Sequence, residues 1–98
     1  MNTKKLKKIR AELESILRSP YGRTAREFES LAAQLGRTLD ARGKEPTYVR
    51  SAAPSLSPPL SIPSHAKEFG AGLAKSLANA LLSDVDDWEI FLLEVDDE

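Results

Sequence analysis

Apolar residues recur every three or four positions in three stretches of the chain, the spacing that places side chains on one face of a helix. Residues 4–19 carry the first such stripe, made of Leu6, Ile9, Leu13, Ile16 and Leu17. Residues 24–36 carry the second, made of Phe28, Leu31, Ala32 and Leu35. The third begins at Gly70 and contains Leu73, Leu77, Leu81, Val85 and Trp88. The pattern therefore predicts three amphipathic helices.

Residues with known preferences for helix ends sharpen these boundaries. Thr24 and Glu27 are three positions apart, as in a capping box, in which each side chain bonds the other residue's backbone N–H. Gly36 suits the position just after a helix, where the backbone is often left-handed. Ser83 and Asp84 favour caps over helix interiors, so they mark a kink or a restart within the third helix.

The middle of the chain has the composition of short strands. Residues 37–42 and 47–51 alternate β-branched or aromatic residues with polar ones, and a Gly-to-Pro break at 43–46 separates them. A third strand is expected near 60–62. The prolines around it cannot donate hydrogen bonds to a ladder, which places this strand at an edge.

The order of the predicted elements is helix, helix, strand, strand, strand, helix. Three strands covered on one face by helices make a two-layer α+β sandwich with an antiparallel sheet. A chain of 98 residues is the size of one small domain, so we expect residues 1–98 to form a single unit.

Composition narrows the class of protein. The chain has no cysteine, and it contains no apolar run long enough for a transmembrane helix. Its basic start lacks the apolar segment of a signal peptide, so a cytoplasmic protein is expected. Residues 1–50 hold twelve Lys and Arg against six Asp and Glu, whereas residues 51–98 hold two against nine. The basic half could attract a phosphate backbone, or the two halves could simply attract one another.

Three sequence segments carry a resemblance to a known family. "GKEPTYV" begins at Gly43, "LSIPSH" ends at His65, and "GAGLAKSLANAL" opens the last helix. In this order they resemble the HicA-like (YcfA) toxin family, whose members are similar in fold to double-stranded-RNA-binding domains. The resemblance covers residues 24–83. It leaves an extra N-terminal helix (1–19) and an acidic C-terminal helical extension (84–98) outside.

The resemblance implies cleavage of messenger RNA and a small antitoxin as partner, but the chain departs from the family at one position. Glu45 stands where the family carries its catalytic histidine, two positions after the turn glycine. His65, the only histidine, lies at the end of the third strand, where the family tends to carry another. RNA cleavage needs a general base and a general acid, which His65 could supply with Glu45 or with Tyr48. A structural role for His65, with no catalysis, is the alternative.

Basic residues suggest where RNA would bind. Arg42, Lys44 and Arg50 lie on the first two predicted strands and their turn, and recognition of duplex RNA rests largely on backbone and 2′-hydroxyl contacts. Lys4 and Lys5 belong to a second basic cluster, on the first helix. For both sets the alternative is a merely solvated charged surface.

A dense apolar cluster near the C-terminus predicts an interface. Trp88, Phe91 and Leu92 lie in a segment with too many large apolar side chains for one helix face. Either the N-terminal helix covers them within the chain, or a partner or a second copy does.

No cofactor or metal site is expected, because one histidine and scattered carboxylates give no ligand spacing. Three hypotheses follow. The chain is an RNA- or antitoxin-binding protein related to HicA-like toxins, an active ribonuclease, or a protein-interaction or dimerisation module. Loss of cleavage in His65→Ala, salt-dependent RNA binding, and a change in mass on replacing Trp88 distinguish them.

Overall fold

The computed structural model describes residues 1–40, 46–56, 58–63 and 68–96. Six elements follow one another along the chain: α1 (Thr3–Arg18), α2 (Ala25–Gln34), β1 (Thr38–Asp40), β2 (Thr47–Val49), β3 (Leu60–Ser61) and α3 (Ala71–Asp96). The predicted α+β class and the order α-α-β-β-β-α are both confirmed.

The three strands form one antiparallel sheet in the order β1-β2-β3. Thr38 pairs with Val49, and Thr47 pairs with Ser61. β2 ends two positions and β3 one position before the predicted end, and β1 begins one position later than predicted; residues 41 and 42 of the predicted first strand lie outside the described residues. At the start of β1 the reason is the preceding helix, because the backbone N–H of Arg37 donates to the Ala32 carbonyl at 3.0 Å and closes the end of α2.

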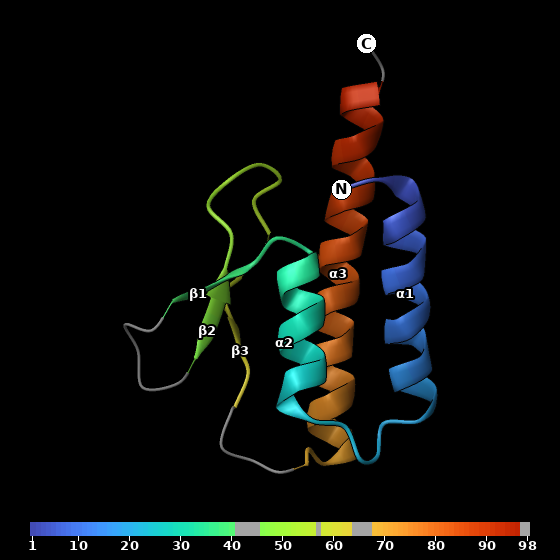
Figure 1. Cartoon of the computed structure of the whole chain (residues 1–98), viewed down its shortest axis with the longest axis vertical. Helices are drawn as coiled ribbons and strands as arrows, with labels where there is room; N and C mark the ends of the chain where they lie inside the picture. Colours follow the sequence, from blue (N-terminus) through green and yellow to red (C-terminus); the bar gives the residue numbers. More distant parts are fainter. Residues whose placement is uncertain (41–45, 57, 64–67, 97–98) are drawn as a thin grey trace.

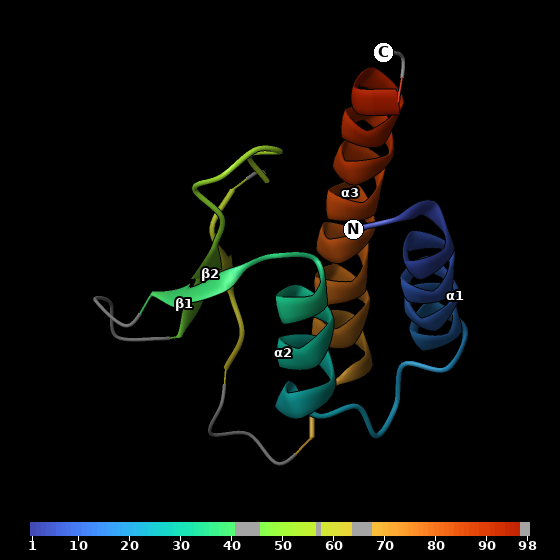
Figure 2. The same cartoon turned by 45° about the horizontal axis from the view of Figure 1, so that its top comes forward.

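The three helices lie on one side of the sheet. Figures 1 and 2 show α2 and α3 next to the strands and α1 on the far side of α3. The longest helix, α3, therefore stands in the middle of the molecule, and its C-terminal turns run past the N-terminus of α1 (Figure 1). No helix in the described part of the chain combines the length and apolar character needed to span a membrane.

The helical stripes form the hydrophobic core. The predicted stripe of α1 is buried except for the half-buried Leu17, and that of α2 is buried throughout. In the first turns of α3, the buried residues differ from the predicted ones. Leu73 is exposed, whereas Ala74 and Ala78 are buried in line with Leu81.

The ends of α2 follow the local sequence signals. Thr24 and Glu27 form the predicted capping box. Gly36 has φ = +97°, and its N–H donates to the Ala33 carbonyl at 3.0 Å. Together with the bond from Arg37, this is the Schellman arrangement, which turns the chain from α2 into β1.

The helix α3 is continuous from Ala71 to Asp96, so the expected kink at Ser83 and Asp84 is wrong. The Ser83 hydroxyl donates to the Asn79 carbonyl at 3.4 Å, one turn earlier. The Asp84 carboxylate instead accepts hydrogen bonds from Arg37, so it does not compete for the helix backbone.

The two terminal helices pack on each other, as their opposite charges predict. Arg10 of α1 donates to Asp86 at 2.8 Å and to Glu89 at 2.6 Å, both on α3. These pairs are on the surface, where ion pairs contribute little stability. The buried stripes of the two helices supply most of the stabilisation of this contact.

Candidate functional site

One end of the sheet brings together the segments around Pro46 and Ile62, which are close in sequence to two candidate residues, Glu45 and His65. β2 and β3 are antiparallel, so the residues that precede β2 lie next to the residues that follow β3. The N–H of Ile62 donates to the carbonyl of Pro46 at 3.1 Å, which continues the pairing one step beyond Ser61. The Ile62 side chain is fully buried, which anchors this end of the sheet on the core.

The catalytic and turn candidates themselves lie outside the described residues. This holds for Glu45 and His65, and for the basic residues Arg42 and Lys44. Glu45 immediately precedes Pro46 in the sequence, and His65 follows Ile62 by three positions. Pro46 and Ile62, which lie one and three positions from these two candidates, are joined by one hydrogen bond. We name this place the motif end of the sheet, defined by Pro46, Thr47 and Ile62.

The second catalytic alternative, Tyr48, is described and lies on β2. Its side chain is half-buried, and it packs against the core. Burial raises the pKa of the Tyr48 phenol above its ordinary value, and the negative charge of Glu29 adds to the increase. A phenol with a raised pKa stays protonated at neutral pH, so it would serve as a hydrogen-bond donor rather than as a base.

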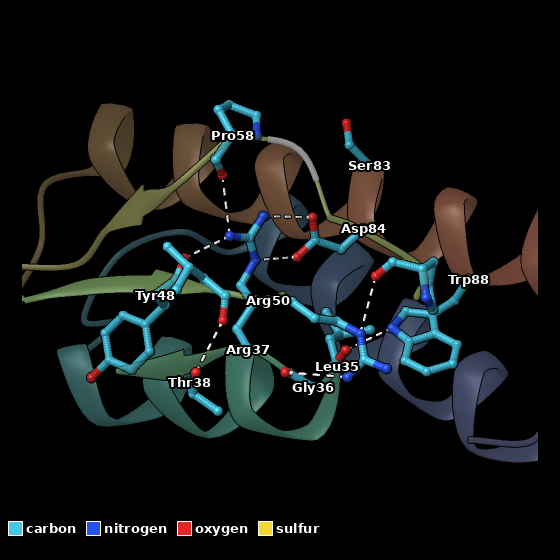
Figure 3. A network of polar contacts seen from close by, with 12 residues as sticks. Leu35, Gly36, Arg37, Thr38, Tyr48, Arg50, Pro58, Ser83, Asp84 and Trp88 are labelled. Atoms are coloured by element: carbon cyan, nitrogen blue, oxygen red, sulfur yellow. Dashed lines mark hydrogen bonds and ion pairs between the residues drawn. The ribbon is translucent and has the colours of Figure 1, made fainter. Parts of the chain in front are cut away.

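Arg50 was predicted to contact RNA, and the structure instead gives its guanidinium partners within the chain. Its nitrogens donate to the carbonyls of Pro54 at 3.0 Å, Ala53 at 2.8 Å and Gly36 at 3.3 Å. The same group lies over the Trp88 ring, 4.8 Å from its centre (Figure 3). This arginine holds the loop after β2 against the end of α2.

Lys4 and Lys5 are exposed on the first turns of α1. The backbone N–H of Lys5 donates to the Asn2 side chain, which caps the helix at 2.8 Å. Because α1 lies on the far side of α3 from the strands (Figure 1), these lysines are not brought together with the motif end of the sheet.

The predicted interface residue Trp88 lies inside the chain. Only 6% of its surface is exposed, and its indole N–H donates to the Leu35 carbonyl at 2.6 Å (Figure 3). Phe91 packs edge-on against the indole, with ring centres 5.7 Å apart. Phe91 and Leu92 are half-buried. Intramolecular packing is therefore what covers Trp88, while Phe91 and Leu92 keep part of their surface accessible.

A buried ion pair, which the sequence reasoning missed, joins the sheet to α3. Arg37 donates to Asp84 through two nitrogens, at 2.5 Å and 2.8 Å, and both side chains are 2% exposed. A third nitrogen of Arg37 reaches the carbonyls of Tyr48 at 2.7 Å and Pro58 at 3.1 Å (Figure 3). Burial raises the pKa of the Asp84 carboxyl, and the hydrogen bonds from Arg37 act in the opposite direction.

One signal could have revealed this pair. Asp84 stands in the apolar stripe of α3, three positions after Leu81 and four before Trp88, so a charged side chain occupies a core position. A buried charge needs a partner of opposite sign, and Arg37 directly follows the glycine that turns α2 into the sheet.

Two cavities of the described chain lie between helices, away from the motif end, and a third of about 250 Å³ lies between residues 58–60 and α3, beside Arg37 and Asp84. The first, about 480 Å³, is a groove between the C-terminal part of α1 and the start of α2, lined by Arg23, Arg26 and Glu27 among others. A second of about 310 Å³ lies between the first turns of α1 and the last turns of α3. Among the described residues, no three side chains of the metal-binding types are grouped closely enough to hold an ion.

In comparisons with known proteins, no family model, no curated protein and no solved structure matches the chain.

Proposed function

We propose that the protein binds RNA at the motif end of its sheet, as the resemblance to HicA-like toxins implies. The observation that carries the proposal is the hydrogen bond between Ile62 and Pro46. It sets side by side the two chain segments in which the resemblance places functional residues, although they are far apart in the sequence. The α-β-β-β-α order of residues 25–96 is the order that the resemblance implies for a fold of the double-stranded-RNA-binding kind.

The residue types near this end suit a phosphate backbone. Arg42 and Lys44 belong to the β1–β2 connection, which leads into the motif end through Glu45 and Pro46. Cationic side chains on a connection between strands can reach phosphates and 2′-hydroxyls across the shallow groove of an RNA duplex. Binding of this kind is weakly dependent on sequence and strongly dependent on salt.

Cleavage of RNA would use two further residues close to the motif end in the sequence, His65 and Glu45. His65 could exchange a proton near neutral pH, and Glu45 replaces the imidazole that the family uses as its catalytic base. A carboxylate with an ordinary pKa is a weaker base than imidazole. We therefore propose RNA binding as the function, with any cleavage slow and dependent on His65.

Two double variants, each removing two positive charges, test the binding site. Arg42→Ala/Lys44→Ala is expected to weaken binding of a labelled structured RNA about tenfold or more at low salt. Lys4→Ala/Lys5→Ala, on the far side of the molecule, is the matched control and is expected to bind almost normally. Equal losses in both variants would show nonspecific attraction to positive charge and contradict the proposed site.

The same assay tests for cleavage. Wild type and His65→Ala are incubated with the RNA, and fragments are separated by size. Fragments from the wild type alone would make the protein a ribonuclease that acts without the family histidine. Intact RNA with a salt-dependent shift would establish a binder. If the RNA is neither cut nor shifted, the proposal is wrong.

A further inference from the structure

The buried stripe of α3 continues beyond the part of the helix that the other helices cover. Its members alternate four and three positions apart, and they are Ala74, Ala78, Leu81, Val85, Trp88, Leu92 and Val95. The stripe is buried as far as Trp88, Leu92 is half-buried, and Val95 is 49% exposed. This alternation is the pattern of helices that pack against one another at a small crossing angle.

Other apolar side chains surround this uncovered stretch. Leu93 is 70% exposed and Ile90 is 58% exposed, although a side chain of this type is usually buried in a small domain. Leu92 and Leu93 also line the cavity of about 310 Å³, together with Leu6 and Lys7 of α1. We name Ile90, Leu92, Leu93 and Val95 the α3 overhang. Figure 1 shows the last turns of α3 extending past the N-terminal end of α1 and clear of the sheet.

Charges at the two sides of the overhang are opposite. The sequence from Glu94 onward, "EVDDE", is acidic, and the first turns of α1 carry Lys4, Lys5, Lys7 and Lys8. Glu94 and these four lysines are exposed, and none of them makes an ion pair with another described residue. The lysine-rich turns lie beside residues 89–93 of α3, because Thr3 and Lys7 line the cavity with Glu89 and Leu93.

We propose that the α3 overhang is the contact surface of a homodimer in which the overhangs of two copies pack antiparallel. A twofold pair presents the same patch twice, so the uncovered stripe of each copy covers that of the other. In this arrangement the acidic end of each α3 reaches past the centre of the contact to the lysine-rich start of the other copy's α1. The inference does not depend on the proposed RNA function.

The charges at the ends of the overhang favour antiparallel over parallel packing of the two copies. Parallel packing would place the two acidic ends together and leave both sets of lysines without partners, and like charges repel. The antiparallel arrangement joins opposite charges at both ends of the contact. The apolar centre supplies the attraction, and the charges select the direction.

Sedimentation equilibrium of the full chain over a range of concentrations tests the dimer. The weight-average mass is expected to rise from the 10.8 kDa monomer to twice that value, without larger species. Leu93→Asp is expected to weaken dimerisation about tenfold or more, because it places a charge next to Leu92, at the edge of the uncovered stripe. A monomer at every concentration, or assembly beyond two copies, would overturn the proposal.

Leu39→Asp is the matched control. Leu39 is 57% exposed on β1, away from the overhang, so this variant makes the same chemical change at a similarly exposed position. It is expected to dimerise as the wild type does. Circular dichroism of both variants shows that the fold is kept. Equal weakening in both would overturn the assignment of the surface.

An exchange of charges tests the antiparallel direction. Lys7→Glu and Glu94→Lys each place like charges opposite one another at both ends of the homodimer, and each variant alone is expected to be more monomeric than the wild type. In an equimolar mixture every cross-copy contact joins opposite charges again, so a heterodimer is expected to form. Failure of the mixture to associate more strongly than either variant alone would overturn the antiparallel arrangement.

Discussion

Arg37 and Asp84 meet in the interior of the protein through two parallel hydrogen bonds, one from Nε to Oδ2 at 2.5 Å and one from Nη2 to Oδ1 at 2.8 Å. The pair joins the chain entering β1 to the middle of α3. The same guanidinium also bonds the carbonyls of Tyr48 and Pro58, so one side chain ties β2 and the proline-rich loop to the helix. The position of the motif end depends on this attachment of the sheet.

Removing one partner of this pair is expected to be costly. Asp84→Ala leaves the buried guanidinium without its counter-charge, which should lower the free energy of unfolding by about 3–5 kcal/mol. Urea unfolding followed by circular dichroism measures the change. The double variant Arg37→Met/Asp84→Leu removes both charges, and it is expected to lose less than Asp84→Ala does. If Asp84→Ala unfolds at the same urea concentration as the wild type, the pair does not anchor the sheet.

The partial burial of the Tyr48 phenol predicts that the folded protein loses stability at alkaline pH. Its pKa is raised by burial in the folded protein, so above about pH 10, the ordinary phenol value, the unfolded chain releases the proton more readily than the folded one. Ionisation therefore favours unfolding, and stability falls as the pH rises through this range. Urea midpoints from pH 8 upward should show the fall, and Tyr48→Phe should reduce it. Tyr21 is 78% exposed, so Tyr21→Phe is the control and should leave the pH dependence unchanged.

Gly36 is expected to be the least replaceable glycine of the described chain. Its φ of +97° disfavours any side chain, and an added Cβ would clash with the Arg50 guanidinium. Gly36→Ala should lower the free energy of unfolding by about 1–3 kcal/mol. Gly22→Ala separates the two causes, because Gly22 also has a positive φ of +73° but no atom lies within 4 Å of the added Cβ. A loss in Gly36→Ala no larger than in Gly22→Ala would show that contact with Arg50 contributes nothing.

Arg50 is expected to matter for stability rather than for RNA. Arg50→Ala removes donors from the carbonyls of Gly36, Ala53 and Pro54 and the cation above the Trp88 ring. The free energy of unfolding should fall by about 1.5–3 kcal/mol, which the emission of the single tryptophan can follow during urea unfolding. Arg18→Ala, on the exposed surface of α1, is the control. Weaker RNA binding with unchanged stability would contradict the role assigned here.

The sequence predicts the helices well because their stability depends on local patterns. The stripe of Leu6, Ile9, Leu13 and Ile16, and the caps at Thr24 and Gly36, are features of neighbouring residues. Contacts between distant residues are harder to predict. The start of β1 at Thr38 rather than at Arg37 follows from a backbone bond of Arg37 to α2, and the continuity of α3 through Asp84 follows from a partner 47 positions away.

The candidate site can be predicted from the sequence only in part, because it combines local motifs with contacts between distant residues. Motif spacing indicates the segments around Glu45 and His65, but only the pairing of β2 with β3 brings their flanking residues together. The sequence does not reveal which basic residues are engaged within the chain. In the sequence, Arg50 and Lys4 are both cations near apolar residues. The structure shows that Arg50 is bonded to carbonyl groups of the chain, whereas Lys4 is exposed.

The most direct test of the proposed function is to map amide chemical shifts of the labelled protein during titration with a short RNA duplex at low salt. If RNA binds at the motif end, the N–H signals of Thr47 and Ile62 shift as RNA is added, and those of Lys4 and Lys5 shift much less. Shifts confined to the first turns of α1, or no shifts at any RNA concentration, would contradict it.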